Sequence, residues 1–164
     1  MIVISDTTPL HYLILLGKAG LLEKLFGKII IPDAVFDEMR HAGTPEVVRR
    51  WIEALPAWIE VKTPSRANFE KVKKLGKGET QAIALAIETG ANAILMDDRK
   101  AIREARKNNL IVLTTLGILE LGAAKNLIDF SKTINELAQT NFRLPSDEII
   151  EEFIKRDAER QQKP

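Results

Sequence analysis

Short runs of consecutive apolar residues alternate along this chain with longer segments whose apolar residues recur every three to four positions. The short runs are rich in isoleucine and valine, which is typical of strands buried on both faces. The longer segments begin at helix-starting residues such as Thr8-Pro9 and stop at glycines such as Gly17 and Gly90. The pattern predicts strands at 2–5, 28–31, 58–61, 93–96 and 110–113, and helices at 8–16, 21–26, 34–41, 44–55, 66–75, 79–89, 99–107, 116–125, 129–140 and 147–161.

The order of these elements predicts the fold class. Strands that alternate with helices favour an α/β layer fold with a mostly parallel central sheet. A chain of 164 residues is long enough for a sizeable core and favours one domain, so we expect a single domain over residues 1–164. No internal repeat or linker interrupts it, and we expect the last few residues to fray.

Composition narrows the chemistry. The chain has no cysteine and two histidines, which excludes thiol catalysis, disulfide scaffolds and cysteine-ligated metal sites. A metal would therefore be held mostly by carboxylates, which suits Mg²⁺ or Mn²⁺. The net charge of +1 gives no general field for nucleic acid. No apolar run approaches the roughly 18 residues of a membrane span, and no leader precedes the first strand, so we expect a cytoplasmic protein.

Acidic residues recur where predicted strands end. Asp6 follows the first strand, and Asp97 and Asp98 follow the strand at 93–96. Glu38 and Glu79 lie in helices that start from the same edge of the sheet. Ligands of open parallel sheets bind beyond this edge, and converging carboxylates repel one another unless a cation or a proton intervenes. An oxygen-ligated divalent cation that bridges phosphate oxygens and activates water implies phosphodiester hydrolysis. Each acid taken alone is equally well explained as a helix cap or a solvated side chain.

Five segments carry a resemblance to a known family. They are Val3-Ile4-Ser5-Asp6-Thr7-Thr8-Pro9-Leu10, Ile29-Ile30-Ile31-Pro32 with Val35 and Glu38, Gly76-Lys77-Gly78-Glu79 with 82–86, Leu95-Met96-Asp97-Asp98-Arg99, and Thr114-Thr115-Leu116-Gly117. Together they resemble the PIN-domain ribonucleases, the family of the VapC toxins, and within it a branch described only as nucleic-acid-binding. The resemblance runs from Ile2 to about Glu159.

The resemblance implies a three-layer α/β/α domain that acts as an Mg²⁺- or Mn²⁺-dependent endoribonuclease, with Asp6, Glu38, Glu79 and Asp98 as catalytic acids. Asp97 stands beside them as a further candidate metal ligand. It also implies RNA as substrate, a toxin of a toxin–antitoxin pair and a small antitoxin protein as partner. Glu79 stands where many members carry aspartate, and Lys100 where toxins often carry a second acid, so the number of metals stays open.

Candidate substrate contacts surround these acids. Thr8 and Thr115 are placed to hydrogen-bond an acid or the attacking water, although turn or cap roles explain them equally well. Arg99, Lys100 and Arg103, followed by Arg106 and Lys107, are placed to track a phosphate backbone, and Lys71, Lys73, Lys74 and Lys77 form a second candidate patch. A solvated helix face explains either basic run equally well.

Two apolar stripes, one around Trp51 and one at Ile149, Ile150, Phe153 and Ile154, pack internally or form a homodimer contact, and we expect a homodimer.

Three other readings compete with the nuclease. A receiver-type phosphoacceptor needs its acid pair after the first strand, where this chain has Asp6 alone. A haloacid-dehalogenase-like phosphatase needs Asp-x-Asp there, but the chain has Asp6-Thr7-Thr8. The remaining alternative is a catalytically inactive PIN-like module that binds RNA or protein.

Overall fold

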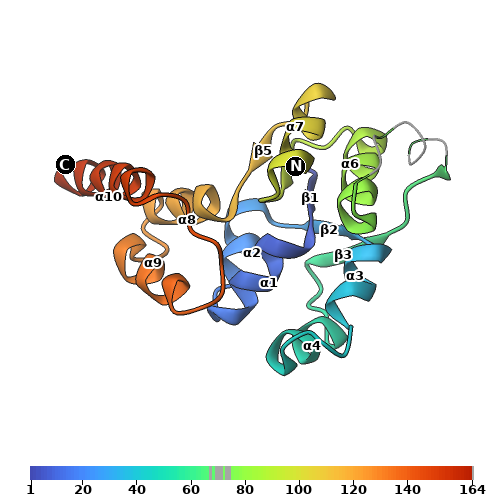
Figure 1. The fold of residues 1–164 in the computed structure, drawn as a ribbon, viewed down its shortest axis with the longest axis horizontal. Coiled ribbons are helices and arrows are strands. Elements are labelled where there is room, and N and C mark those ends of the chain that lie inside the picture. Colours follow the sequence, from blue (N-terminus) through green and yellow to red (C-terminus); the bar gives the residue numbers. More distant parts are fainter. Residues whose placement is uncertain (67, 69–71, 73–74, 164) are drawn as a thin grey trace. The chain divides into compact units, whose positions relative to one another are not determined.

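A five-stranded, all-parallel sheet organises the computed structural model, which describes residues 1–66, 68, 72 and 75–163. Its strands are β1 (Val3–Ser5), β2 (Ile29–Pro32), β3 (Ile59–Lys62), β4 (Ala93–Leu95) and β5 (Val112–Leu113). They lie in the order β3-β2-β1-β4-β5, so that β1 pairs with both β2 and β4. Figure 1 labels β1, β2, β3 and β5. The chain therefore builds the sheet outward from β1 in two directions, which confirms the predicted α/β class.

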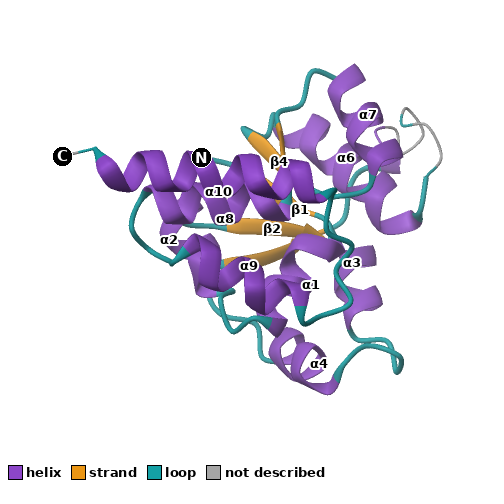
Figure 2. Ribbon diagram, turned by 60° about the vertical axis from the view of Figure 1, so that its left-hand side comes forward, coloured by secondary structure: helices purple, strands orange, loops and turns teal. Residues whose placement is uncertain are grey.

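Helices pack on the two faces of this sheet (Figure 2). Ile4 lies in register with Ile30 on β2 and Ile94 on β4, and all three pack with α6 and α7 in one buried cluster. Side chains alternate along a strand, so the equally buried Val3, Ile29 and Leu95 point to the opposite face. The helices between consecutive strands are α1 (Thr7–Leu15), α2 (Gly20–Phe26), α3 (Asp33–Met39), α4 (Glu46–Glu53), α6 (Lys77–Thr89) and α7 (Arg99–Lys107).

The chain separates into two compact units, Met1–Thr115 and Leu116–Pro164. The second contains most of α8 (Thr115–Ala124), with α9 (Phe130–Ala138) and α10 (Asp147–Gln162). Within it Phe130 stacks on Phe153 at 5.9 Å between ring centroids, and Glu120 accepts hydrogen bonds from Arg156 and Arg160. These interactions hold α10 to α8 and α9. The expectation of one domain over residues 1–164 stays a prediction.

The described elements follow the predicted ones closely. The helix at 99–107 is found with the predicted bounds, whereas α6 begins at Lys77 instead of Glu79 and β5 keeps two of the four residues predicted for it. The predicted helix at 66–75 lies largely outside the described residues, as do Lys71, Lys73 and Lys74. No helix in the described part of the chain is both long enough and apolar enough to cross a membrane.

Candidate functional site

The strand order creates a ligand-binding position between β1 and β4. Chain connections leave these neighbouring strands in opposite directions, and in open parallel sheets ligands bind at such a point, beyond the carboxyl ends of the strands. Asp6 directly follows β1, and Asp97 lies two residues beyond the end of β4. The Asp6 N–H donates to the Leu95 carbonyl at 2.9 Å, which fixes the first acid against the neighbouring strand.

A pocket of about 530 Å³ opens beside Asp6. Its walls come from three segments of the first unit, namely the start of α1, α3 with the turn after it, and the start of α6. Asp6, Glu38 and Glu79, predicted as catalytic acids, all line it, and so does Thr8. Asp97 and Asp98 do not. The fold thus gathers three of the predicted acids in one pocket and leaves the adjacent pair outside its walls.

Gly78 lets two of these carboxylates approach each other. A Cβ atom at Gly78 would lie 3.1 Å from Glu38 Oε2 and 3.5 Å from Asp6 Oδ1. The distance between the two oxygens is therefore at most the sum of these two distances, and both border the space that a side chain at position 78 would occupy. The Cβ atom of an alanine at position 78 would occupy this space, so glycine leaves room for both carboxylates.

Asp6 is the most perturbed of the acids. It is only 4% exposed, and this burial raises the pKa of its carboxyl group to about 7. A hydrogen bond from the Thr7 backbone opposes the shift, and the charges of Glu79, Glu38 and Asp97 add to it. Asp6 occupies the cap position of α1, but its side chain makes no capping hydrogen bond. Burial of the ionised carboxylate therefore costs free energy, and no capping hydrogen bond of the side chain offsets this cost.

Glu38 is held by a threonine that the sequence did not single out. The Thr7 hydroxyl donates to Glu38 Oε2 at 2.9 Å. Thr8 lines the same pocket, but no hydrogen bond of Thr8 to a predicted acid is observed among the described residues. The Asp6-Thr7-Thr8 segment alone could not distinguish the two hydroxyls, since both belong to the first turn of α1.

Glu79 has a structural contact as well as a place in the pocket. Its Oε2 atom accepts the Gly76 N–H at 3.0 Å, at the start of α6. Burial raises the pKa of the Glu79 carboxyl group, the Gly76 hydrogen bond opposes this, and the charges of Asp98 and Glu38 add to the rise. One carboxylate oxygen of Glu79 thus stabilises the start of α6, while the negative charges of two other acids repel the ionised group.

Asp97 and Thr115 form a pair at the ends of neighbouring strands. Thr115 donates to the Asp97 carboxylate twice, from its backbone N–H at 3.0 Å and from its hydroxyl at 2.6 Å. Burial raises the pKa of Asp97, and these two hydrogen bonds oppose the rise. The structure places Thr115, a predicted substrate contact, against Asp97.

Asp98 is exposed and caps α7. Its Oδ1 atom accepts the Ala101 N–H at 2.9 Å, as expected of a helix cap. Its charge nevertheless reaches the pocket, because it contributes to the raised pKa of Glu79. The two neighbouring aspartates therefore act on different members of the acid group, Asp97 on Asp6 and Asp98 on Glu79.

Comparison with known proteins decides the family. Residues 2–159 match the family model DUF3368, described as a PIN domain. The chain belongs to the PIN-domain family. A solved structure of a PilT N-terminus domain protein from the hyperthermophilic archaeon Sulfolobus solfataricus P2 is 13% identical, with a TM-score of 0.44, over 88% of this chain and 100% of that one. A comparison with curated proteins gives no match.

PIN domains are generally nucleases, and the acid pocket of this one lies at the carboxyl edge of the sheet. The donor atoms of this PIN domain suit a hard cation, since the pocket presents carboxylate oxygens and the sequence has no cysteine. The pKa values of Asp6 and Glu79 are raised because burial and neighbouring charges disfavour their ionised forms. A bound cation would favour the ionised forms. Among the described residues no three ligand side chains already stand close enough to hold a metal ion.

The basic residues predicted to contact substrate lie on α7 of this PIN domain. Arg99, Lys100 and Arg103 are all exposed, as are Arg106 and Lys107. Lys77, from the second predicted patch, lines the acid pocket itself. The basic face of α7 therefore starts directly after Asp98, at the cap of the same helix.

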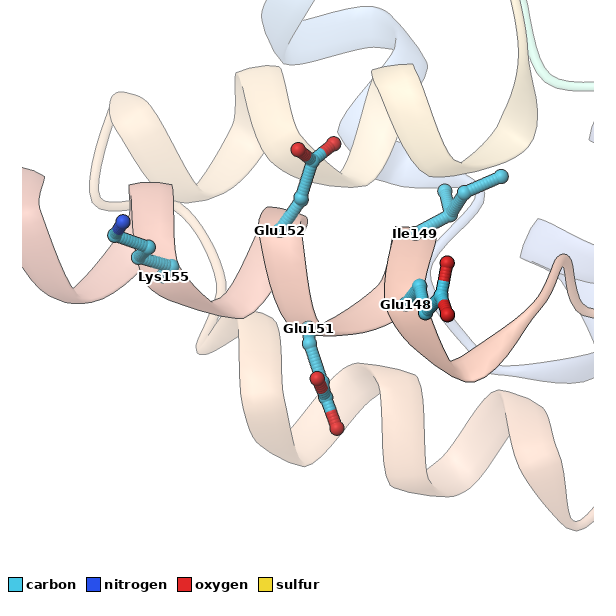
Figure 3. A pocket seen from close by; sticks show the side chains of 5 residues that line it. All are labelled: Glu148, Ile149, Glu151, Glu152 and Lys155. Carbon is cyan, nitrogen blue, oxygen red and sulfur yellow. The ribbon is translucent and has the colours of Figure 1, made fainter.

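A second hollow lies on the surface of α10 and shares no lining residue with the acid pocket. It measures about 390 Å³ and is lined by Glu148, Ile149, Glu151, Glu152 and Lys155 (Figure 3). None of these residues was predicted for the site. All five come from a single helix and four are charged, which is the character of a solvated helix surface.

Mutation can distinguish the roles of the neighbouring residues Asp97 and Asp98. If Asp98 is a catalytic acid, as the family resemblance implies, Asp98→Asn is expected to lower RNA cleavage more than Asp97→Asn. Asparagine caps helices about as well as aspartate, so Asp98→Asn should leave the melting temperature nearly unchanged. Cleavage assays and thermal melts of both variants check this. A larger loss from Asp97→Asn would instead make Asp97, whose charge acts on Asp6, the ligand at this strand end.

Proposed function

We propose that the protein is a divalent-metal-dependent endoribonuclease that hydrolyses RNA phosphodiester bonds. One observation carries the proposal. Asp6 at the start of α1, Glu38 near the end of α3 and Glu79 in the first turn of α6 line one pocket, where burial and mutual repulsion raise the pKa of Asp6 to about 7. Such an arrangement destabilises the protein in the absence of a cation and is typical of functional sites.

Asp6, Glu38, Glu79 and Asp98 would hold Mg²⁺ or Mn²⁺, with Asp97 as a further ligand. When bound, the cation supplies Lewis-acid polarisation of the phosphate and activation of water. The chain's own residues orient the acids, because Thr7 fixes Glu38 and Thr115 fixes Asp97. Thr8 lies in the pocket wall, within reach of a bound substrate. The exposed Arg99, Lys100 and Arg103 would then contact the RNA backbone.

We further propose a toxin role with a small antitoxin protein as partner, and a homodimer in the cytoplasm. The resemblance to VapC toxins supports the first. Exposed apolar side chains support a protein contact, since Val47 on α4 is 55% exposed and Ile149 on α10 is 45% exposed. A gene for a small antitoxin-like protein beside this one would support the toxin role, and its absence would favour a nuclease that acts alone.

The alternative is an inactive PIN domain that binds RNA or protein. The contacts of the adjacent aspartates favour it, because Asp98 caps α7 and Asp97 is bound twice by Thr115. Both contacts are explained without any metal.

Cleavage of a mixed RNA pool separates the two readings. The purified protein is incubated with the pool in Mn²⁺ and in excess chelator, and the ends of the products are mapped by sequencing. Discrete internal cuts in Mn²⁺ that vanish with chelator are expected of the nuclease. RNA that is retained on the protein but stays intact in Mn²⁺ would establish the binding module instead.

A further inference from the structure

His41 lies in the acid pocket but has no part in the function proposed above. It follows α3, three residues beyond Glu38, and lines the same pocket as Asp6 and Glu38. Its backbone N–H donates to the Glu38 carbonyl at 3.1 Å, and its own carbonyl accepts the Thr44 N–H at 2.9 Å. This tight turn holds an exposed imidazole at the wall of the pocket that the acids line.

The ring of His41 has one nitrogen committed to the turn. The Gly43 N–H donates to Nδ1 at 3.1 Å. A nitrogen that accepts a hydrogen bond carries no proton, so we assign the proton of the neutral ring to Nε2. A Cβ at Gly43 would lie 3.4 Å from Nδ1 and 3.9 Å from Cε1, so the ring rests against the backbone of this glycine. The Nε2–H group is the hydrogen-bonding group that the ring has left for another partner.

The pocket needs such a donor if it takes a phosphodiester. Four acids line it, since Asp37 joins Asp6, Glu38 and Glu79, and they repel a phosphate group. Lys77 is the other basic side chain among the described residues that line it. A neutral N–H donor binds a phosphate oxygen without competing for the cation that the acids would hold.

We propose that the Nε2–H group of His41 donates a hydrogen bond to a phosphate oxygen of the polynucleotide bound at the acid pocket. The proposal rests on the nuclease function proposed above and adds a substrate contact to it. His41 and the acids would thus act on the same phosphate group in different ways. The acids would hold the cation that contacts it, and the imidazole would donate a hydrogen bond to one of its oxygens.

Two substitutions separate the two ring nitrogens. The amide oxygen of asparagine in His41→Asn can replace Nδ1 as the acceptor for Gly43, but the variant has no donor at the position of Nε2. The amide nitrogen of glutamine in His41→Gln can replace Nε2 as the donor, but the variant loses the local acceptor. A purely structural role predicts that His41→Gln melts lower than His41→Asn. A substrate contact predicts the opposite order for RNA affinity.

Binding is measured by fluorescence anisotropy with a labelled single-stranded RNA of mixed sequence, on an Asp6→Asn background that blocks cleavage and carries one repelling charge fewer in the pocket. His41→Asn is expected to weaken RNA binding roughly tenfold, the loss of one hydrogen bond to a charged group. His41→Gln is expected to stay within about threefold of the background protein. In the protein with Asp6 intact, the same order is expected for cleavage, mainly as a rise in KM.

Equal RNA affinity of both His41 variants and the background protein would overturn the His41 proposal while cleavage by the parent left the nuclease intact. Equal losses in both variants would also overturn it, because the donor alone would not suffice. Weakened binding in His41→Asn together with no cleavage by the parent in Mn²⁺ would support the His41 contact and overturn the nuclease. RNA that binds neither parent nor background would overturn both.

Discussion

Replacement of Asp6 with asparagine is expected to lower Mn²⁺-dependent RNA cleavage by at least about 100-fold. Asparagine keeps the shape of the side chain but removes the charge that a cation needs. Asp6 is the buried member of the acid group, and the charges of Glu79, Glu38 and Asp97 all act on it. Its replacement therefore removes the acid on which the charges of the others act. Initial rates on one mapped RNA target, at saturating Mn²⁺, measure the effect.

The matched control for this variant is Asp147→Asn. Asp147 is an exposed acid in the first turn of α10 and takes no part in the acid pocket. Its replacement removes the same charge and should leave cleavage within about twofold of the parent, since exposed sites tolerate such changes. Cleavage at the parental rate by Asp6→Asn would show that Asp6 holds no essential cation. An equal loss in both variants would point to net charge instead.

The sequence allowed the sheet and the positions of the acids to be predicted for a simple reason. Continuous apolar runs such as Ile29-Ile30-Ile31 mark buried parallel strands, and each run ends at a residue that the chain must place at the same edge. Asp6 and Asp97 lie near that edge because β1 and β4 are neighbours. The alternation of strands and helices predicted a parallel sheet, whereas the strand order that makes β1 and β4 neighbours came from the structure.

Contacts between distant residues were not predictable in this way. The Thr7–Glu38 hydrogen bond joins residues 31 positions apart, and the Thr115–Asp97 pair spans 18 positions. Which of two adjacent residues faces a partner depends on the exact exit angle of a strand or helix, and one residue of shift reverses it. The close approach that Gly78 permits and the orientation of the His41 ring depend in the same way on the packed structure.

Asp6 should also make the stability of the metal-free protein depend on pH. Its folded-state pKa is raised from 3.8 to about 7, so between these values the folded protein binds a proton that the unfolded chain releases. The free energy of unfolding must then fall as pH rises through this window. Because the carboxyl group is almost fully buried, the whole shift applies and corresponds to roughly 4 kcal/mol.

Urea unfolding of the parent and Asp6→Asn, in chelator and at several pH values between about 4 and 8, measures this term as a difference. Relative to the variant, the parent is expected to lose roughly 4 kcal/mol of stability as pH rises. Glu79 and Asp97 titrate in both proteins, so their raised pKa values largely cancel in the comparison. Parallel curves for the two proteins would show that Asp6 is ionised throughout and that its burial is compensated within the protein.

Addition of Mn²⁺ at neutral pH should reverse the loss in the parent. A cation that binds only the folded state adds about 2.7 kcal/mol at roughly a hundredfold excess over its Kd, and it favours the ionised carboxylate. For a chain of this size, that corresponds to a rise in melting temperature of roughly 5–10 °C. The rise should nearly disappear in Asp6→Asn and persist in Asp147→Asn. A parent that shows the pH dependence but no response to Mn²⁺ would carry a buried, protonatable aspartate without a metal site, and the inactive binding module would then be the better account.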